Sequence, residues 1–76
     1  GRDSPEQTIR DHWPSLVGAP NAAYSHPARI ERNMLIVVAA HAVVRNEIFL
    51  NRATIMERIR KLPGCGSVKA LKLRAG

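Results

Sequence analysis

The stretch that decides the fold is HPARIERNMLIVV, residues 26–38. It contains Leu35-Ile36-Val37-Val38, an apolar and largely β-branched run that is typical of a buried strand. A polar break at Glu31-Arg32-Asn33 precedes this run, and asparagine tolerates the left-handed backbone of tight turns. His26-Pro27 suits the start of an edge strand, where the missing proline N–H is harmless. The pattern therefore predicts a β-hairpin with strands over residues 26–32 and 34–39.

After the hairpin, the sequence changes to the period of a helix. From about His41 to Leu62, apolar side chains recur every three or four residues. At 100° per residue they fall within about 60° of one another. We therefore expect one long helix whose core-facing stripe is formed by Val44, Ile48, Ile55, Ile59 and Leu62.

A second apolar strip, made of Phe49, Ala53 and Met56, lies beside this stripe. Packing against the N-terminal helix is the simpler explanation, and contact with a partner is the other, because exposed Met and Phe serve adaptable interfaces. Trp13 has the same two explanations, since tryptophan at a helix break can anchor a core or form a binding hot spot. The candidate partner-binding residues are Trp13, Phe49 and Met56.

The N-terminal third reads as a helical segment with interruptions. It begins with SPEQ at residues 4–7, in which the serine can cap free N–H groups, the proline suits the first helical position and the glutamine completes a capping box. Pro14 disfavours helical geometry at Trp13, and Gly18 extends the interruption. We therefore expect a broken helix over residues 5–24.

A last strand is predicted after the long helix. In a strand over residues 67–74, every second side chain lies on the same face, and Lys69, Leu71 and Leu73 share one face. A strand, a helix and a second strand in succession favour parallel pairing of the last strand with a member of the hairpin. The expected fold class is α+β, in the order broken α, β, β, α, β, with a three-stranded mixed sheet packed by the long helix. We expect residues 5–76 to form this single domain and residues 1–4 to be disordered or an expression remnant.

The composition limits the class of protein. The chain has 76 residues, a formal charge of +6 and 45% hydrophobic residues, which suit one small folded domain with an anionic partner. A single cysteine excludes a disulfide framework and favours a cytoplasmic location. The longest apolar stretch, residues 34–44, is too short to span a membrane and follows no signal peptide, so no membrane partner is expected.

The candidate nucleic-acid-binding residues are basic side chains on the hairpin and the last strand. Neither strand carries an aromatic platform for stacking bases, so binding is expected to be electrostatic, sequence-nonspecific and sensitive to salt. A solvated surface explains these side chains nearly as well. The candidates are Arg29, Arg32, Lys69, Lys72 and Arg74.

The sequence carries no pattern typical of a catalytic or metal site. Its three histidines, His12, His26 and His41, and Cys65 lack the spacing that brings metal ligands together, and Cys65 lies in a glycine-flanked turn. Neither GxGxxG nor GxxxxGK occurs, so no phosphate loop is predicted. We expect a protein that is not an enzyme and that uses no cofactor, metal or small-molecule substrate.

Four stretches in this order resemble a known family. They are WPSLVG at residues 13–18, NMLIV at 33–37, Val44 with Glu47 and Ile48, and VKALKLR at 68–74. Together they resemble the DciA family, bacterial loaders or operators of the replicative helicase, although that family usually has tryptophan where this chain has Val44. The resemblance covers about residues 12–74 and implies a KH-like domain that engages the helicase and binds single- or double-stranded DNA.

Two other functions stay open. A KH-like domain can bind RNA, although the GxxG loop with which such domains hold a nucleic-acid backbone is missing here. A purely structural interaction domain, whose charge only confers solubility, is the third class. The leading expectation is a binding module of bacterial DNA replication.

Overall fold

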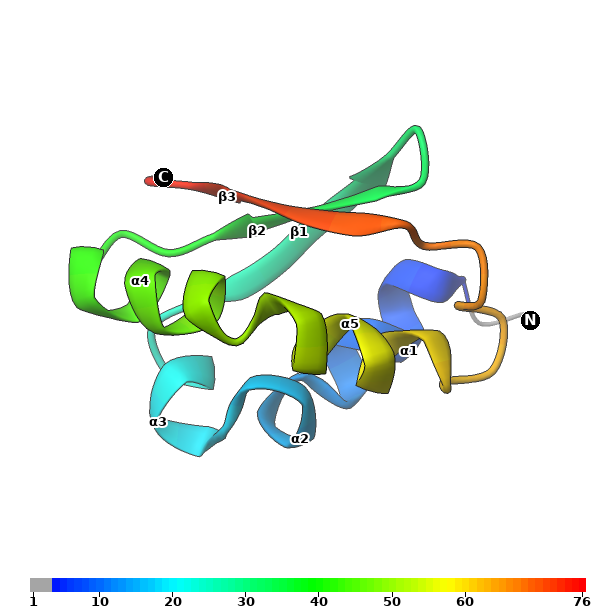
Figure 1. Cartoon of the computed structure of the whole chain (residues 1–76), viewed down its shortest axis with the longest axis horizontal. Helices are drawn as coiled ribbons and strands as arrows, with labels where there is room; N and C mark the ends of the chain where they lie inside the picture. Colours follow the sequence, from blue (N-terminus) through cyan, green and yellow to red (C-terminus); the bar gives the residue numbers. More distant parts are fainter. Residues whose placement is uncertain (1–3) are drawn as a thin grey trace.

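The computed structural model describes residues 4–76 and places the helices of this part on one side of a single sheet (Figure 1). The core lies between the two layers, and no helix of the described residues covers the other sheet face. The α+β class, the three-stranded mixed sheet and the element order are as predicted. The elements are α1 (Pro5–Asp11), α2 (Trp13–Val17), α3 (Ala19–Ala22), β1 (His26–Glu31), β2 (Met34–Val38), α4 (Ala42–Leu50), α5 (Arg52–Arg60) and β3 (Ala70–Arg74).

β1 and β2 form the predicted hairpin. They pair antiparallel, with Glu31 opposite Met34 beside the turn. The two turn residues, Arg32 and Asn33, have φ values of 52° and 66°. Positive φ at both positions of a two-residue loop is the type I′ turn, whose twist matches that of the flanking strands. This turn fixes the register, and the register decides which side chains face away from the helices.

β3 pairs with β2 in parallel, as predicted, so β2 is the central strand of the sheet. Leu71 and Leu73 pack against the core. The strand begins at Ala70 rather than at residue 67, so Lys69 precedes it. The backbone N–H of Lys69 donates to the Asn33 carbonyl at 2.7 Å, which ties the incoming chain to the hairpin turn.

The N-terminal helical segment is broken twice, in agreement with the sequence. α1 ends at Asp11, and the break falls at His12, so Trp13 is not excluded from helix but begins α2. α2 ends at Val17, before Gly18, whose φ of 93° suits glycine. Trp13 is 4% exposed, and its Nε1–H donates to Ser25 Oγ at 3.0 Å. The indole therefore holds α2 against the chain that leads into β1.

Ser4 caps α1, because its Oγ accepts from the Gln7 N–H at 3.1 Å. Residue 4 is thus part of the folded chain, and the rest of the stretch expected to be disordered, residues 1–3, lies outside the described residues. The predicted capping box is only half formed. The Gln7 side chain donates to Asp11 Oδ1 at 2.8 Å instead of returning to the cap.

The predicted single long helix is wrong at one position, Asn51, which separates α4 from α5. Its φ of −101° and ψ of 13° depart from helical values. The Asn51 Nδ2 donates to the Glu47 carbonyl at 2.9 Å, and such side-chain bonds compete with the helical backbone. Among residues 4–76, no helix is long and apolar enough to cross a membrane.

The predicted core stripe survives this break. Val44, Ile48, Ile55 and Ile59 are buried, and Leu62 is half-buried against them. The stripe meets the apolar sides of α1, α2 and β2. These contribute Ile9, Trp13, Leu16, Val17, Leu35 and Val37 to the same cluster.

The second strip does not pack against the N-terminal helix, contrary to the simpler explanation. Met56 is buried, but Phe49 and Ala53 are exposed beside β3. α2 approaches α5 from elsewhere, where Arg58 donates to the Leu16 carbonyl at 3.0 Å. A helix has two flanks beside its core stripe, and its neighbours decide which flank is covered.

Shortening Ile48 should unfold most of the protein. Ile48 is fully buried, and an Ile→Ala change in a core costs about 2–5 kcal/mol, whereas a domain of this size has a stability of only about 3–5 kcal/mol. Urea unfolding followed by circular dichroism should show Ile48→Ala largely unfolded without denaturant. The control Val43→Ala, at a residue of α4 that is 79% exposed, should keep its midpoint, and equal effects of the two changes would contradict this core.

Candidate nucleic-acid and partner interfaces

The sheet face turned away from the helices carries the candidate nucleic-acid surface. Side chains of a strand alternate between the two faces, and Leu35 and Val37 belong to the core cluster whereas Ile36 does not. The register partners of Ile36, Arg29 on β1 and Lys72 on β3, therefore share its face. This surface, the open face, is formed by His26, Arg29, Glu31, Met34, Ile36, Val38, Ala70, Lys72 and Arg74.

The open face is apolar along its middle and basic on its flanks. Ile36 is only 2% exposed although no helix of the described chain covers it. It lies between Arg29 and Lys72, and long basic side chains cover apolar surface with their stems while their charged ends stay in water. Toward the turn, a hollow of about 300 Å³ is lined by Glu31, Arg32, Met34, Ile36, Lys72 and Arg74.

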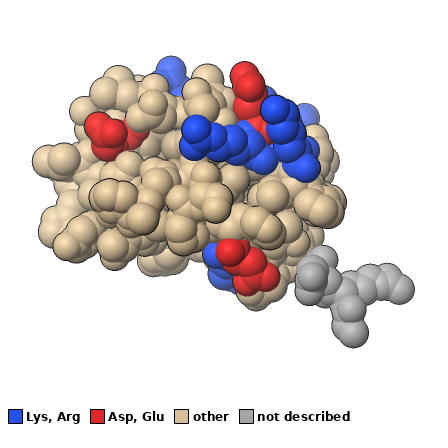
Figure 2. Space-filling view, turned by 90° about the horizontal axis from the view of Figure 1, so that it is seen from below, with Lys and Arg blue, Asp and Glu red and all other residues tan. Residues whose placement is uncertain are grey.

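The helical side of the molecule has a different character. Figure 2 shows it largely uncharged, with a few basic groups beside acidic ones. Two arginines of α4 and α5 serve the fold: Arg58 donates to the Leu16 carbonyl, and Arg45 donates to the carbonyls of Ala39 and Ala40 at 2.9 Å each. These two cations satisfy backbone groups, so they add little to a surface for phosphates.

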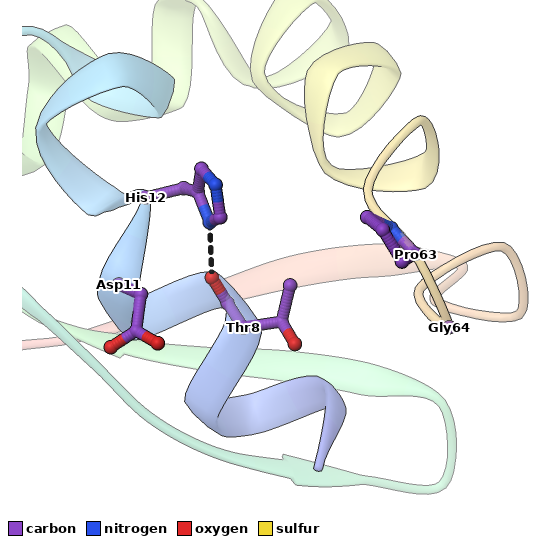
Figure 3. A pocket seen from close by; sticks show the side chains of 5 residues that line it. All are labelled: Thr8, Asp11, His12, Pro63 and Gly64. Carbon is purple, nitrogen blue, oxygen red and sulfur yellow. Dashed lines mark hydrogen bonds between the residues drawn. The ribbon is translucent and has the colours of Figure 1, made fainter. Parts of the chain in front are cut away.

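A hollow of about 440 Å³ separates α1 from the Pro63-Gly64 loop (Figure 3). Two of its polar side chains, those of Asp11 and His12, are bonded locally. His12 Nδ1 donates to the Thr8 carbonyl at 2.8 Å, and Asp11 accepts from Gln7 at the same distance. Within residues 4–76, neither this hollow nor any other place gathers three metal-ligating side chains.

Cys65 has the environment of a structural cysteine. It is fully buried, and this burial raises the pKa of its thiol. Covalent catalysis uses the thiolate, which forms where the pKa is lowered by cations or a helix N-terminus. The thiol therefore serves packing better than nucleophilic attack.

Four of the five predicted nucleic-acid residues lie together. Arg29, Lys72 and Arg74 are on the open face, and Arg32 is in the adjoining turn. Lys69 does not join them, because it precedes β3 and lines another groove. Strand alternation in the sequence already separates Lys69 from Lys72 and Arg74, because Lys69 is in phase with Leu71 and Leu73, which pack against the core.

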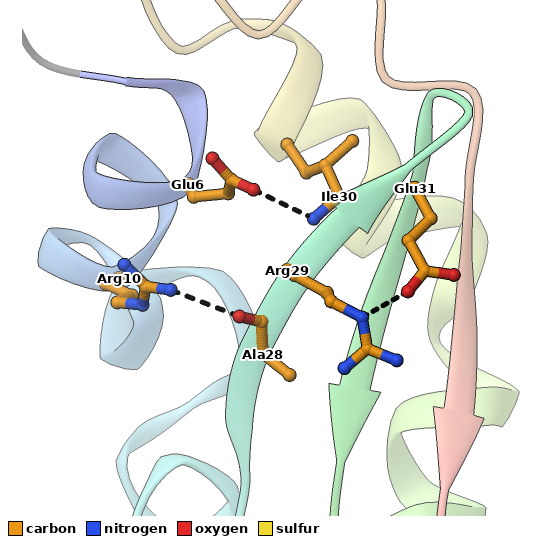
Figure 4. Close-up of polar contacts among 6 residues, drawn as sticks. All are labelled: Glu6, Arg10, Ala28, Arg29, Ile30 and Glu31. Atoms are coloured by element: carbon orange, nitrogen blue, oxygen red, sulfur yellow. Dashed lines mark hydrogen bonds and ion pairs between the residues drawn. The ribbon is translucent and has the colours of Figure 1, made fainter.

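Arg29 is partly neutralised by Glu31. Arg29 Nε donates to Glu31 Oε2, and the two side chains form an ion pair along β1 (Figure 4). The hydrogen bond and the charge of Arg29 lower the pKa of Glu31, and Arg74 and Arg32 add smaller effects in the same direction. With four cations and one carboxylate, the open face and its turn carry a net charge of +3.

The three predicted partner residues do not share one surface. Trp13 and Met56 are 4% and 5% exposed and belong to the core, whereas Phe49 is 48% exposed. The guanidinium of Arg52 lies 4.0 Å from the centre of the Phe49 ring, a cation–π contact. Of the three, Phe49 alone is substantially exposed, and Met56 reaches the surface only where it lines a groove beside Phe49.

Phe49 lies at the wall of a groove of about 390 Å³ between α5 and β3. The apolar strip of Phe49, Ala53 and Met56 supplies one wall of this groove. The other wall cannot be read from the sequence, because the two walls come from segments that become neighbours only in the folded chain. We call it the α5–β3 groove. It is lined by Phe49, Arg52, Ala53, Met56, Arg60, Lys69, Ala70 and Leu71.

The ion pair on β1 should be visible in the titration of Glu31. The folded pKa of Glu31 is lowered, so in Arg29→Gln the titration midpoint should rise toward the ordinary value of about 4.3. Carbon-detected NMR of the side-chain carboxyl measures this midpoint. Lys61→Gln, which removes an equal charge outside the open face, should leave it in place, and a midpoint unmoved by Arg29→Gln would contradict the pairing.

We compared the sequence of the whole chain with curated proteins and with models of protein families. No curated protein shows significant similarity to it. The model of the family described as "Dna[CI] antecedent, DciA" matches residues 4–73, nearly the full length. This match confirms the resemblance seen in the sequence and associates the chain with DNA replication and the replicative helicase. This chain, which packs a layer of helices on one face of a sheet and carries basic side chains on the other face, belongs to the DciA family.

Proposed function

We propose that this chain is a non-enzymatic binding module that acts on the replicative helicase in the bacterial cytoplasm and binds DNA through its open face. Family membership supports the helicase part. The DNA part is carried by one observation, the register that sets Arg29, Lys72 and Arg74 on a sheet face without helices. The KH-like shape implied by the resemblance belongs to the same proposal.

The open face suits phosphates better than bases. Lys72 and Arg74 are two residues apart on β3, or about 6.6 Å, and Arg29 lies two strands away, or about 10 Å. Cations at such spacings can neutralise several phosphates together and release their counterions. The residues of the open face include no Phe, Tyr or Trp, so base stacking contributes little and selectivity among sequences is weak.

Binding of single-stranded DNA should depend on salt through a small number of phosphates. Four contacts, from Arg29, Arg32, Lys72 and Arg74, give a slope of about −2.8 for log K against log salt, or roughly a 50-fold loss between 50 and 200 mM. Lys72→Gln should make the slope less steep by about 0.7. Fluorescence anisotropy with a labelled oligothymidine measures both slopes.

The matched control for this experiment is Lys61→Gln. Lys61 is exposed at the end of α5, and its loss changes the total charge equally. A slope reduced as much by Lys61→Gln as by Lys72→Gln would mean that only the overall charge matters. Affinity that persists unchanged at high salt would contradict the electrostatic mechanism.

The helicase part needs its own titration. The labelled chain should form a complex with purified replicative helicase, seen as a faster-sedimenting species in analytical ultracentrifugation. Separate titrations with single-stranded DNA and with RNA of the same sequence distinguish the proposal from an RNA-binding domain. A response to RNA alone, with no complex with the helicase, would overturn the assignment.

A further inference from the structure

The outer edge of β3 is open for pairing. The Arg74 carbonyl accepts from the Ala39 N–H at 2.9 Å, so the backbone groups of Arg74, and by alternation those of Lys72, point to β2. The backbone groups of Leu71 and Leu73 point the other way. Within residues 4–76, no hydrogen bond from another element reaches them. A row of free N–H and C=O groups is a template for another strand.

The opposite edge of the sheet is closed. On β1, the Ile30 N–H donates to Glu6 Oε2 at 3.2 Å, and the Ala28 carbonyl accepts from Arg10 Nη2 at 3.1 Å (Figure 4). Both side chains come from α1 and occupy the positions that a neighbouring strand would take. The molecule thus protects one edge against strand addition and leaves the other edge accessible.

The accessible edge adjoins an apolar groove. In Figure 1, α4 and α5 run beneath β3, and the α5–β3 groove lies between that strand and α5. Its apolar lining includes Phe49, Ala53 and Met56, and its basic groups are Arg52, Arg60 and Lys69. A strand edge beside a helix is the geometry in which peptides bind by strand addition, with main-chain bonds for affinity and a groove for alternate side chains.

Charge and hydrogen-bonding groups distinguish three candidate ligands of this edge: a second copy of the chain, a nucleic-acid backbone and a peptide. β3 and its lead-in carry Lys69, Lys72 and Arg74 without any acidic residue, so pairing with β3 of a second copy would set like charges opposite each other. A phosphate backbone has acceptors but no donors, and it would leave the outward carbonyls of Leu71 and Leu73 without partners. An acidic peptide offers donors, acceptors and the complementary charge.

The alternation of a strand then specifies the sequence pattern of this peptide. Side chains on the helical side of an added strand enter the α5–β3 groove, which is apolar at its centre. Side chains on the other side lie next to Lys72 and Arg74 on the open face. We propose that the edge of β3 and the α5–β3 groove bind an extended peptide of alternating apolar and acidic residues as a fourth strand. This binding uses the strand edge and the groove instead of phosphate contacts on the open face, and it does not rest on the proposed function.

The first test uses a capped octapeptide of alternating valine and glutamate as the probe. In ¹⁵N–¹H correlation spectra of the full chain, the amides of Leu71 and Leu73 should shift on titration, and their hydrogen exchange should slow at least tenfold. A peptide of alternating valine and lysine should bind at least tenfold more weakly. Absence of shifts at millimolar probe would overturn the proposal.

The second test removes the backbone N–H donors of the probe, one alternate set at a time. N-methylation of all its valines and N-methylation of all its glutamates each delete one set of alternate N–H groups. Because an added strand directs only one set at β3, one peptide should lose at least tenfold in affinity while the other keeps most of it. Equal losses, or none, would show binding by charge alone and would contradict strand addition.

The third test changes the groove. Ala53→Trp should fill the groove and weaken the valine–glutamate probe at least tenfold, whereas Thr54→Trp, the same bulk at the next exposed position of α5, should not. Well-dispersed spectra check that both variants fold, and the N-methylated probes decide the matter if one does not. Oligothymidine binding that is weakened by Ala53→Trp but not by Thr54→Trp, with no shifts from the probe, would identify the groove as a nucleic-acid site, and a dimer in sedimentation without probe would identify a second copy as the occupant. Either result would overturn the proposal.

Discussion

The structure depends on the pairing of β2 on both sides, antiparallel with β1 and parallel with β3. An antiparallel pair needs only a two-residue turn, but a parallel pair needs a connection that returns the chain to the same end of the sheet. α4 and α5 make this connection, and together with the N-terminal helices they cover one face. Leu35 and Val37 are fully buried on that side, and Arg29, Ile36 and Lys72 are left on the other. The basic surface therefore follows from the topology as much as from the composition.

Much of this fold could be predicted because the sequence signals for most of its helices and strands lie within the segments themselves. The helical period of Val44, Ile48, Ile55 and Ile59 identified the core side of the crossover, since a period is a property of one segment. The same period does not indicate the break at Asn51, because one side-chain hydrogen bond to the Glu47 carbonyl interrupts the helix without changing the spacing of the apolar residues. The N-terminal breaks were foreseen, since proline and glycine act on the backbone directly.

The candidate site was less predictable, because it is made by contacts between segments. Charge along the chain suggested five cations, but Lys69 precedes β3 and is in phase with Leu71 and Leu73, so it lies in a different groove from Lys72. Apolar character suggested Trp13 and Met56 as partner residues, yet both are buried, and Met56 reaches the surface only as part of the α5–β3 groove. A sequence shows that a side chain is apolar, whereas its burial depends on which neighbours arrive on that flank of the helix.

The two proposed surfaces meet at β3, and their ligands are therefore coupled. An acidic side chain on the open-face side of an added strand would lie about 5 Å from Lys72 or Arg74 and would act on these cations as Glu31 acts on Arg29. Each such carboxylate lowers the net charge of +3 that attracts phosphates and lowers the number of counterions released on DNA binding. By linkage, DNA would weaken the peptide by the same factor. The two ligands would then weaken each other's binding through charge alone, without any change in the conformation of the domain.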